Sequence, residues 1–109
     1  MSSDSYRQRV QSHQQEISRL QTDKAREAER VADYQKRSNE ASGKASRASN
    51  ASSAQSCLRD AQRYSEQAAG SQKKVAEIET KIAREQSRLG HAQKELDREA
   101  ETGLCRRRV

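Results

Sequence analysis

Proline, phenylalanine and tryptophan are absent from this chain of 109 residues, and only three tyrosines and four glycines occur. A globular domain of this length normally builds its core from large apolar side chains, yet only 30% of these residues are hydrophobic. Burial of so little apolar area does not offset the loss of chain entropy in a compact globule. The composition therefore leaves long helices or disorder, and the absence of proline favours helices.

Cysteine is also scarce, and no long apolar run exists. Cys57 and Cys105 are far apart and form no CxxC pair, which argues against a disulfide framework or a zinc site. No segment approaches the roughly 20 apolar residues that span a bilayer, and the N-terminus lacks the apolar stretch of a secretory signal. Because free thiols are typical of the reducing cytosol, we expect a cytoplasmic protein without a membrane span.

What the chain does contain is a regular spacing of apolar residues. In each half, these residues recur at intervals of seven, with others three or four residues off the series. Seven residues are about two helical turns, so each series forms one stripe along a helix, as in a coiled coil. The predicted coiled-coil seam consists of Tyr6, Val10, Ile17, Leu20, Val31, Tyr34, Val75, Ile78, Ile82, Leu89 and Leu96.

A Ser-rich stretch separates the two halves. We predict a first helix over about 5–41, a turn over about 42–53 and a second helix over about 54–101. Capping boxes beginning at Ser5 and Ser52 mark the helix starts, and Gly103 is expected to end the second helix, ahead of a flexible basic tail over 102–109. The alternative is one unbroken helix of roughly 140 Å, at about 1.5 Å per residue.

The predicted fold class is therefore all-α, a long antiparallel helical hairpin that forms a coiled coil. A register in which facing residue numbers sum to 102 brings large residues opposite small ones in several layers, and it places Leu20 beside Ile82. It also places Ile17 beside Glu85, which is a poor pair. So thin a seam is expected to be covered by a second copy, giving a helical bundle.

The net charge of +6 comes mostly from the middle of the chain, because residues 1–40 and 75–109 each hold eight basic and seven acidic side chains. A patch there can meet phosphate or an acidic partner, although a solvated helix surface has the same composition. Tyr64 is the only aromatic residue nearby, so base stacking is not expected. The candidate anion-binding residues are Lys44, Arg47, Arg59, Arg63, Lys73 and Lys74.

No arrangement of residues resembles an active site, so we expect no catalysis, no cofactor and no small-molecule substrate. The two histidines, His13 and His91, lie within a turn of each other in the predicted register, which allows a metal pair or a pH-sensitive contact. No carboxylate or thiol is expected to complete such a site. His13 is then a tolerated seam residue, and Cys57 serves as a small hydrophobic residue.

Residues 49–101 contain a Ser-rich break, then an S-x-L-R-like helix start, a K-I-A run and an L-x-x-A-Q-x-x-L-x-x-E close. The matching residues are Ser56, Leu58, Arg59, Lys81, Ile82, Ala83, Leu89, Ala92, Gln93, Leu96 and Glu99. This stretch resembles the N-terminal coiled-coil region of bacterial Toll/interleukin receptor (TIR) type effectors and related proteins of defence. Because eight residues follow Glu101, we expect the effector domain of that family to be absent here.

The resemblance and the heptads together predict a non-catalytic oligomerisation or interaction module. Its expected partner is a second copy of itself or another coiled-coil protein. Two alternatives remain: a basic helical protein that binds nucleic acid or an acidic surface through residues 41–74, and a small helical hairpin of a secretion apparatus. The Trp-x-Gly turn of one such secreted family is missing, because the chain has no tryptophan.

Overall fold

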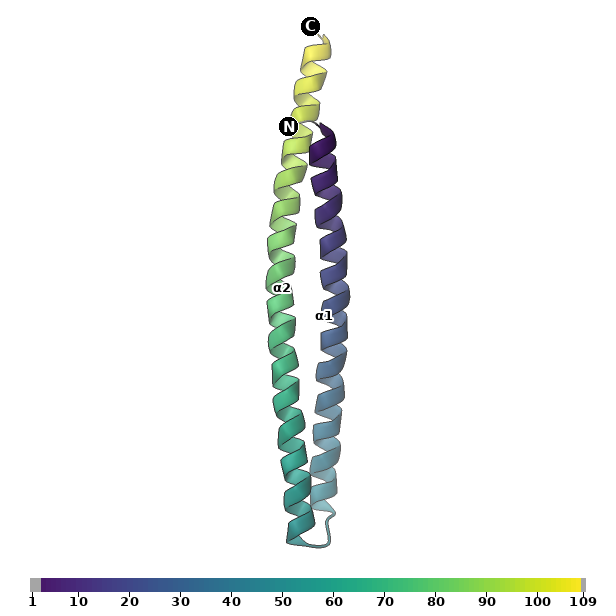
Figure 1. The fold of residues 1–109 in the computed structure, drawn as a ribbon, viewed down its shortest axis with the longest axis vertical. Helices are drawn as coiled ribbons and strands as arrows, with labels where there is room; N and C mark the ends of the chain where they lie inside the picture. The colour runs from purple at the N-terminus through teal and green to yellow at the C-terminus, as the bar shows by residue number, and fades with distance from the viewer. Residues whose placement is uncertain (1–2, 109) are drawn as a thin grey trace. The chain divides into compact units, whose positions relative to one another are not determined.

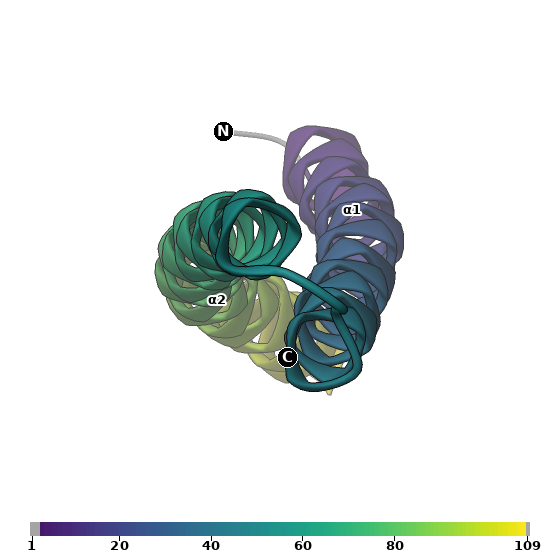
Figure 2. The same ribbon diagram turned by 90° about the horizontal axis from the view of Figure 1, so that it is seen from below.

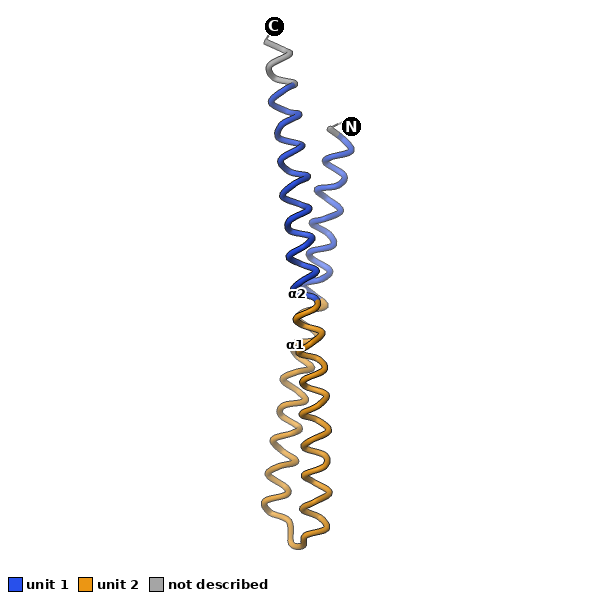
Figure 3. The backbone as a smooth tube through the Cα atoms, turned by 90° about the vertical axis from the view of Figure 1, so that its left-hand side faces the viewer, with its two compact units in different colours: residues 1–22, 78–109 blue, residues 23–77 orange. Residues whose placement is uncertain are grey.

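The computed structural model describes the backbone of residues 3–108 and the side chains of residues 4–102. This part of the chain contains two helices and no strand: α1, Ser3–Ser46, and α2, Ala51–Arg108 (Figure 1). The chain divides into two units, in each of which a segment of α1 runs antiparallel to a segment of α2 (Figure 3). The predicted all-α helical hairpin is confirmed.

Unit 1 comprises residues 1–22 and 78–109, and unit 2 comprises residues 23–77. Unit 2 contains the turn, a short connection between α1 and α2 that is visible from the turn end in Figure 2. Each unit contains a segment of both helices and its own part of the seam between them.

The turn is shorter than predicted. Helix α1 continues to Ser46 and α2 begins at Ala51, so residues 47–50 alone connect them, in place of 42–53. Two features favour the longer α1: Ala45 is a strong helix former and is half-buried in the seam, and Lys44 lies in the last turn, where a cation interacts favourably with the helix dipole. Serine and glycine at 42 and 43 are too weak as helix breakers to outweigh these effects.

Asn50, not Ser52, caps the start of α2. Its side-chain Oδ1 accepts a hydrogen bond from the backbone N–H of Ser53 at 2.7 Å, and its carbonyl accepts one from Ala54 at 3.1 Å. Asparagine is among the strongest N-cap residues, because its side chain satisfies an amide that has no partner within the helix. The capping box predicted at Ser52 is therefore wrong, since Ser52 already lies inside α2.

The other predicted helix ends also shift outward. Helix α1 begins at Ser3, with Asp4 in its first turn, so the capping box predicted at Ser5 lies inside the helix. Helix α2 continues through Gly103 to Arg108, because one glycine costs a helix only about 1 kcal/mol relative to alanine. The flexibility predicted for the tail concerns residues 102–109; the side chains of residues 103–109 lie outside the described part of the structure.

One stripe of each helix faces the other helix. Every residue at a predicted heptad a or d position, from Tyr6 to Ala45 in α1 and from Ala54 to Glu99 in α2, is buried or half-buried. The hydrophobic core within the described residues is small, and four of its seven members are alanine. These buried residues are Val10, Leu20, Ala41, Ala61, Ala68, Ile82 and Ala92.

The burial pattern agrees with the predicted register. In unit 1, Leu20 and Ile82 are 3% and 9% exposed, and their numbers sum to 102. In unit 2, Ala41 and Ala61 form the corresponding buried pair, at 7% and 6% exposed. The Ser38 hydroxyl donates a hydrogen bond of 2.9 Å to the carbonyl of Ala61, which joins the two helices in the same region.

The heptad phase changes across the turn. Ala45 and Ala54 both occupy a positions but are nine residues apart, which is about two and a half helical turns at about 100° per residue. If the chain continued as one helix, the stripes of α1 and α2 would therefore lie on opposite faces. The turn is what lets both stripes face one another.

Candidate functional site

The predicted seam residues all lie at the contact between α1 and α2 within their unit. Val10, Leu20 and Ile82 are buried, whereas the other eight remain half-buried. Two helices alone cover a seam from one direction and leave its edges open to water. The half-buried seam residues are Tyr6, Ile17, Ile78, Leu89 and Leu96 in unit 1 and Val31, Tyr34 and Val75 in unit 2.

Unit 1 contains a polar contact in the middle of this seam. The Glu85 carboxylate accepts a hydrogen bond at 2.7 Å from Nδ1 of His13 on α1 and another at 2.8 Å from Arg88 on its own helix. The Glu85 side chain is only 13% exposed. Hydrogen bonding to His13, with a further contribution from Arg88, lowers the pKa of Glu85 below its ordinary value, so the ionised carboxylate is the stabilised form.

This contact was not anticipated from the sequence. The predicted register places His13 opposite Leu89 and Glu85 opposite Ile17, but the two polar side chains reach diagonally across one helical turn. The sequence contained a signal for this contact. His13 and Glu85 both occupy d positions of their helices and are the polar seam residues in that region. Their pairing satisfies two polar groups that would otherwise face apolar neighbours.

A shallow groove beside the pair is lined by Tyr6, Arg9 and His13 from α1 and by Arg88, His91 and Glu95, among others, from α2. Arg9 stacks over the Tyr6 ring at 6.0 Å from its centroid. Both histidines thus line one groove, as the predicted register implies. Within the described residues, no group of three or more His, Cys, Asp or Glu side chains is arranged to hold a metal ion.

Unit 2 has its own polar seam residues. Glu27 is 12% exposed at its side chain and accepts a hydrogen bond of 2.7 Å from Arg30, while its Oε2 is buried without a partner among the described residues. Ser71 is 6% exposed on the facing helix. Polar groups buried in this way reduce the stability of the contact between α1 and α2. The seam of unit 2 is therefore less stable than a wholly apolar seam.

Tyr64, a seam residue of unit 2, is contacted by arginines from both helices. Arg37 of α1 lies over its ring at 5.9 Å and Arg63 of α2 at 5.5 Å from the centroid. Each arginine is also paired with an acidic residue on its own helix, Asp33 for Arg37 and Asp60 for Arg63. Two guanidinium groups therefore lie against the aromatic ring, as in cation–π packing.

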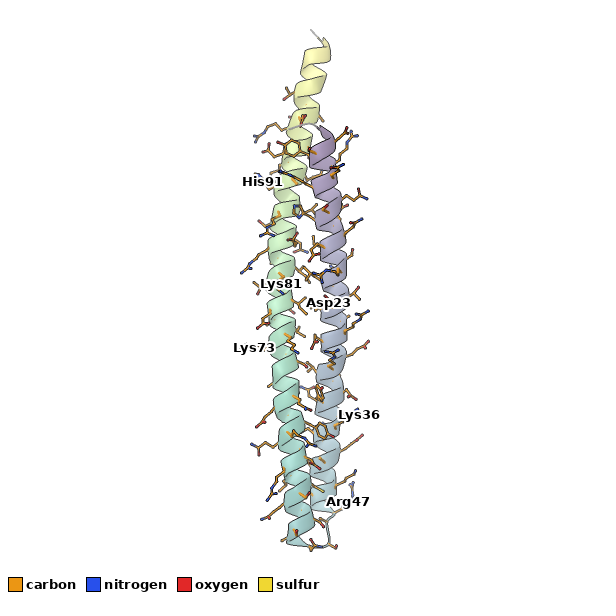
Figure 4. The ribbon with its side chains drawn as sticks, viewed as in Figure 1. Asp23, Lys36, Arg47, Lys73, Lys81 and His91 are labelled. Carbon is orange, nitrogen blue, oxygen red and sulfur yellow. The ribbon has the colours of Figure 1, made fainter. Side chains whose placement is uncertain are left out.

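The structure does not gather the candidate anion-binding residues into one patch. Lys73 lies on the outer face of α2 and points away from α1 (Figure 4). Arg59 shares the outer face of α2 with Lys73, but fourteen residues separate them, about 21 Å along the helix. Lys44 lies in the last turn of α1, Arg47 lies in the connection that follows it, and Arg63 is paired with Asp60 at 3.4 Å.

Unit 2 instead shows a sharp division of charge on the two flanks that border its seam. In antiparallel helices, heptad positions e and b of both chains share one flank, and positions g and c share the other. The first, which we call the uncharged flank, consists of Ala25, Ala28, Ala32, Gln35, Asn39, Ser42 and Ser46 of α1 and Ala51, Gln55, Leu58, Gln62, Ser65, Ala69, Gln72 and Ala76 of α2.

The second, the charged flank, holds eleven charged residues at its fifteen positions. It consists of Asp23, Arg26, Arg30, Asp33, Arg37, Glu40 and Lys44 of α1 and Ser53, Ser56, Asp60, Arg63, Gln67, Gly70, Lys74 and Glu77 of α2. The assignment agrees with observed contacts, because Gln35 of α1 and Ser65 of α2 line one hollow on the uncharged flank.

Comparison with known proteins finds no protein-family model, no curated protein and no solved structure that matches this chain. The resemblance to the coiled-coil region of TIR-type effectors therefore stays a prediction. Neither helix, over its described residues, is long and apolar enough to cross a membrane.

Proposed function

We propose that this chain is a non-catalytic coiled-coil module that associates with a second copy of itself in the cytoplasm. Following the resemblance to TIR-type defence effectors, we propose that such association brings effector domains together in proteins where a region of this kind precedes one. The observation that carries this proposal is the incompletely covered seam. Most of its large apolar residues remain half-buried, and more than half of the buried hydrophobic residues are alanine.

The physical reason is the small gain from so thin a core. Hydrophobic stabilisation scales with the apolar area removed from water, and an alanine contributes much less than a leucine or isoleucine. A second hairpin laid on the first covers the remaining area of half-buried seam residues such as Val31, Tyr34 and Val75. Binding to the folded state alone then stabilises the hairpin through mass action.

Sedimentation and circular dichroism as a function of concentration test this proposal. We expect a strongly helical protein that is larger than a monomer at micromolar concentration and whose melting temperature rises with concentration. A helical monomer with a melting temperature independent of concentration would contradict it.

Binding of nucleic acid or of an acidic surface has less support. The candidate cations of residues 41–74 are divided between the charged flank, the outer face of α2 and the turn, and two arginines lie over the Tyr64 ring. A steep loss of binding with salt would be the signature of that function. The role of a secretion-apparatus hairpin has no specific support beyond the helical hairpin itself.

A further inference from the structure

The uncharged flank of unit 2 is exposed to solvent along its whole length, yet none of its fifteen residues carries a charge. In a chain that is 35% charged, about five charges would be expected there by composition. The charged flank, with the same number of positions and the same relation to the seam, holds eleven. Solvation alone does not explain this contrast, because both flanks meet the same water.

Exclusion of charge is what burial demands. An ionised side chain taken out of water without a partner costs several kcal/mol, whereas alanine, serine and glutamine can be accommodated in a polar helix interface. The only large hydrophobic side chain that the described residues leave exposed, Leu58 at 54%, also lies on this flank. The flank thus has the composition of an interface.

We propose that the uncharged flank of unit 2 packs against the same flank of a second copy of this chain. This inference rests on the proposed self-association and assigns the surface that performs it. A two-fold interface brings one surface patch against itself, so its groups must be self-complementary. Glutamine and asparagine amides both donate and accept hydrogen bonds, and Gln35, Gln62 and Gln72 can therefore pair with their equivalents.

The chemistry of this flank also selects against other partners. Nucleic acid and acidic peptides are attracted by cations, which the flank lacks, and a bilayer surface requires a broad apolar face. The charged flank is unsuited to self-pairing. Its mixed charges are engaged in pairs such as Arg37–Asp33 at 3.1 Å and Arg63–Asp60 at 3.4 Å within the chain. The alanines of the uncharged flank, in contrast, let two helices approach closely.

Two glutamines of α2 supply a matched test. Gln72 lies on the uncharged flank and Gln67 on the charged flank, both are exposed, and they are five residues apart in the same helix segment. Replacing either one with glutamate adds one negative charge at nearly constant side-chain size and helix propensity. The two variants therefore have the same net charge and differ only in the flank that carries the new carboxylate.

We expect Gln72→Glu to raise the dissociation constant for self-association at least tenfold, as measured by sedimentation, because it buries an unpaired charge. Gln67→Glu should leave the constant within about threefold of wild type, as is usual for surface changes. Circular dichroism checks that both variants remain helical.

A second position on the uncharged flank decides the question if Gln72→Glu fails to fold. Ala69 is exposed one helical turn before Gln72, and Ala69→Glu can be compared with Ala69→Gln, which adds the same bulk without the charge. Weaker association of the glutamate variant than of the glutamine variant supports the proposal. If the wild type associates and neither Gln72→Glu nor Ala69→Glu weakens that association, the flank assignment is overturned and self-association stands. The same conclusion follows if Gln67→Glu weakens association as much as Gln72→Glu does. A monomeric wild type overturns the proposed function itself.

Discussion

Nδ1 of His13 lies 2.7 Å from Oε2 of Glu85, so a hydrogen bond joins α1 to α2 across the seam of unit 1. The same carboxylate accepts a second hydrogen bond from Arg88. The contact makes the stability of the hairpin depend on the protonation state of Glu85.

Acidification should weaken the hairpin through this residue. The folded-state pKa of Glu85 lies below its ordinary value of 4.5, so the unfolded chain takes up the proton first as the pH falls. The stabilisation is complete above about pH 4.5 and is lost as the pH falls through the folded-state pKa. We expect Glu85→Gln to lower the melting temperature at pH 7 and to flatten its decline below about pH 5.

Glu66→Gln is the control, because Glu66 is exposed on the outer face of α2. Thermal unfolding should be followed by circular dichroism from about pH 3 to about pH 7 at fixed protein concentration. If the two variants show the same acid profile, the His13–Glu85 contact contributes nothing measurable to the stability.

A charge in the seam should unfold or dissociate the protein. Ile82 is 9% exposed and faces Leu20, so Ile82→Asp buries a carboxylate without a partner. We expect a loss of about 3 kcal/mol or more in the free energy of unfolding. Arg84→Asp introduces the same residue two positions along, on an exposed part of α2, and should change stability by less than about 1 kcal/mol. Equal losses in urea titrations of the two variants would show that the heptad phase is wrong.

The N-cap of α2 supplies a sharper local test. Asn50→Ala removes the side-chain acceptor of the Ser53 amide and should cost about 1 kcal/mol. Ser52→Ala, at the residue that the sequence favoured as a cap, should be nearly neutral because Ser52 is exposed inside the helix. Urea denaturation of both variants decides between the two caps, and a larger loss at Ser52 would support the sequence-based assignment.

The heptad pattern predicted the seam because it depends only on helical periodicity, which local sequence determines. The helix ends were less predictable. Ser42 and Gly43 favour a break by propensity, but partial burial of Ala45 in the seam is a tertiary effect that a local pattern does not contain. Asn50 was overlooked as a cap because Ser52, with Gln55 three residues later, fits the capping-box pattern.

The polar contacts were harder still to foresee. The bond between His13 and Glu85 crosses one helical turn diagonally, so it depends on side-chain conformation as well as on register. For the candidate anion-binding cations, closeness in sequence wrongly suggested closeness in space. Arg59 and Lys73 belong to one basic stretch, but helical geometry sets them about 21 Å apart.

The change of heptad phase at the turn leads to a final prediction: within one chain, the beginning of α1 lies a short distance from the facing part of α2. Gln8 of α1 and Lys94 of α2 are both exposed and lie in unit 1 at the same level of the predicted register. Cysteines at these sites, with Cys57 and Cys105 replaced by serine, can carry spin labels. Packed helices are about 10 Å apart and about 10–12 Å wide, so we expect a label separation below about 30 Å.

The labelled protein should be diluted into an excess of unlabelled chain, so that only distances within one chain are measured. A single unbroken helix would place the two sites about 130 Å apart at about 1.5 Å per residue, beyond the range of the measurement. Loss of the short distance on dilution would mean that α1 packs against α2 of another chain. Such a rod would need its helix to turn by about half a revolution at residues 47–50 to keep both stripes buried, so the hairpin is the arrangement that the heptad phase favours.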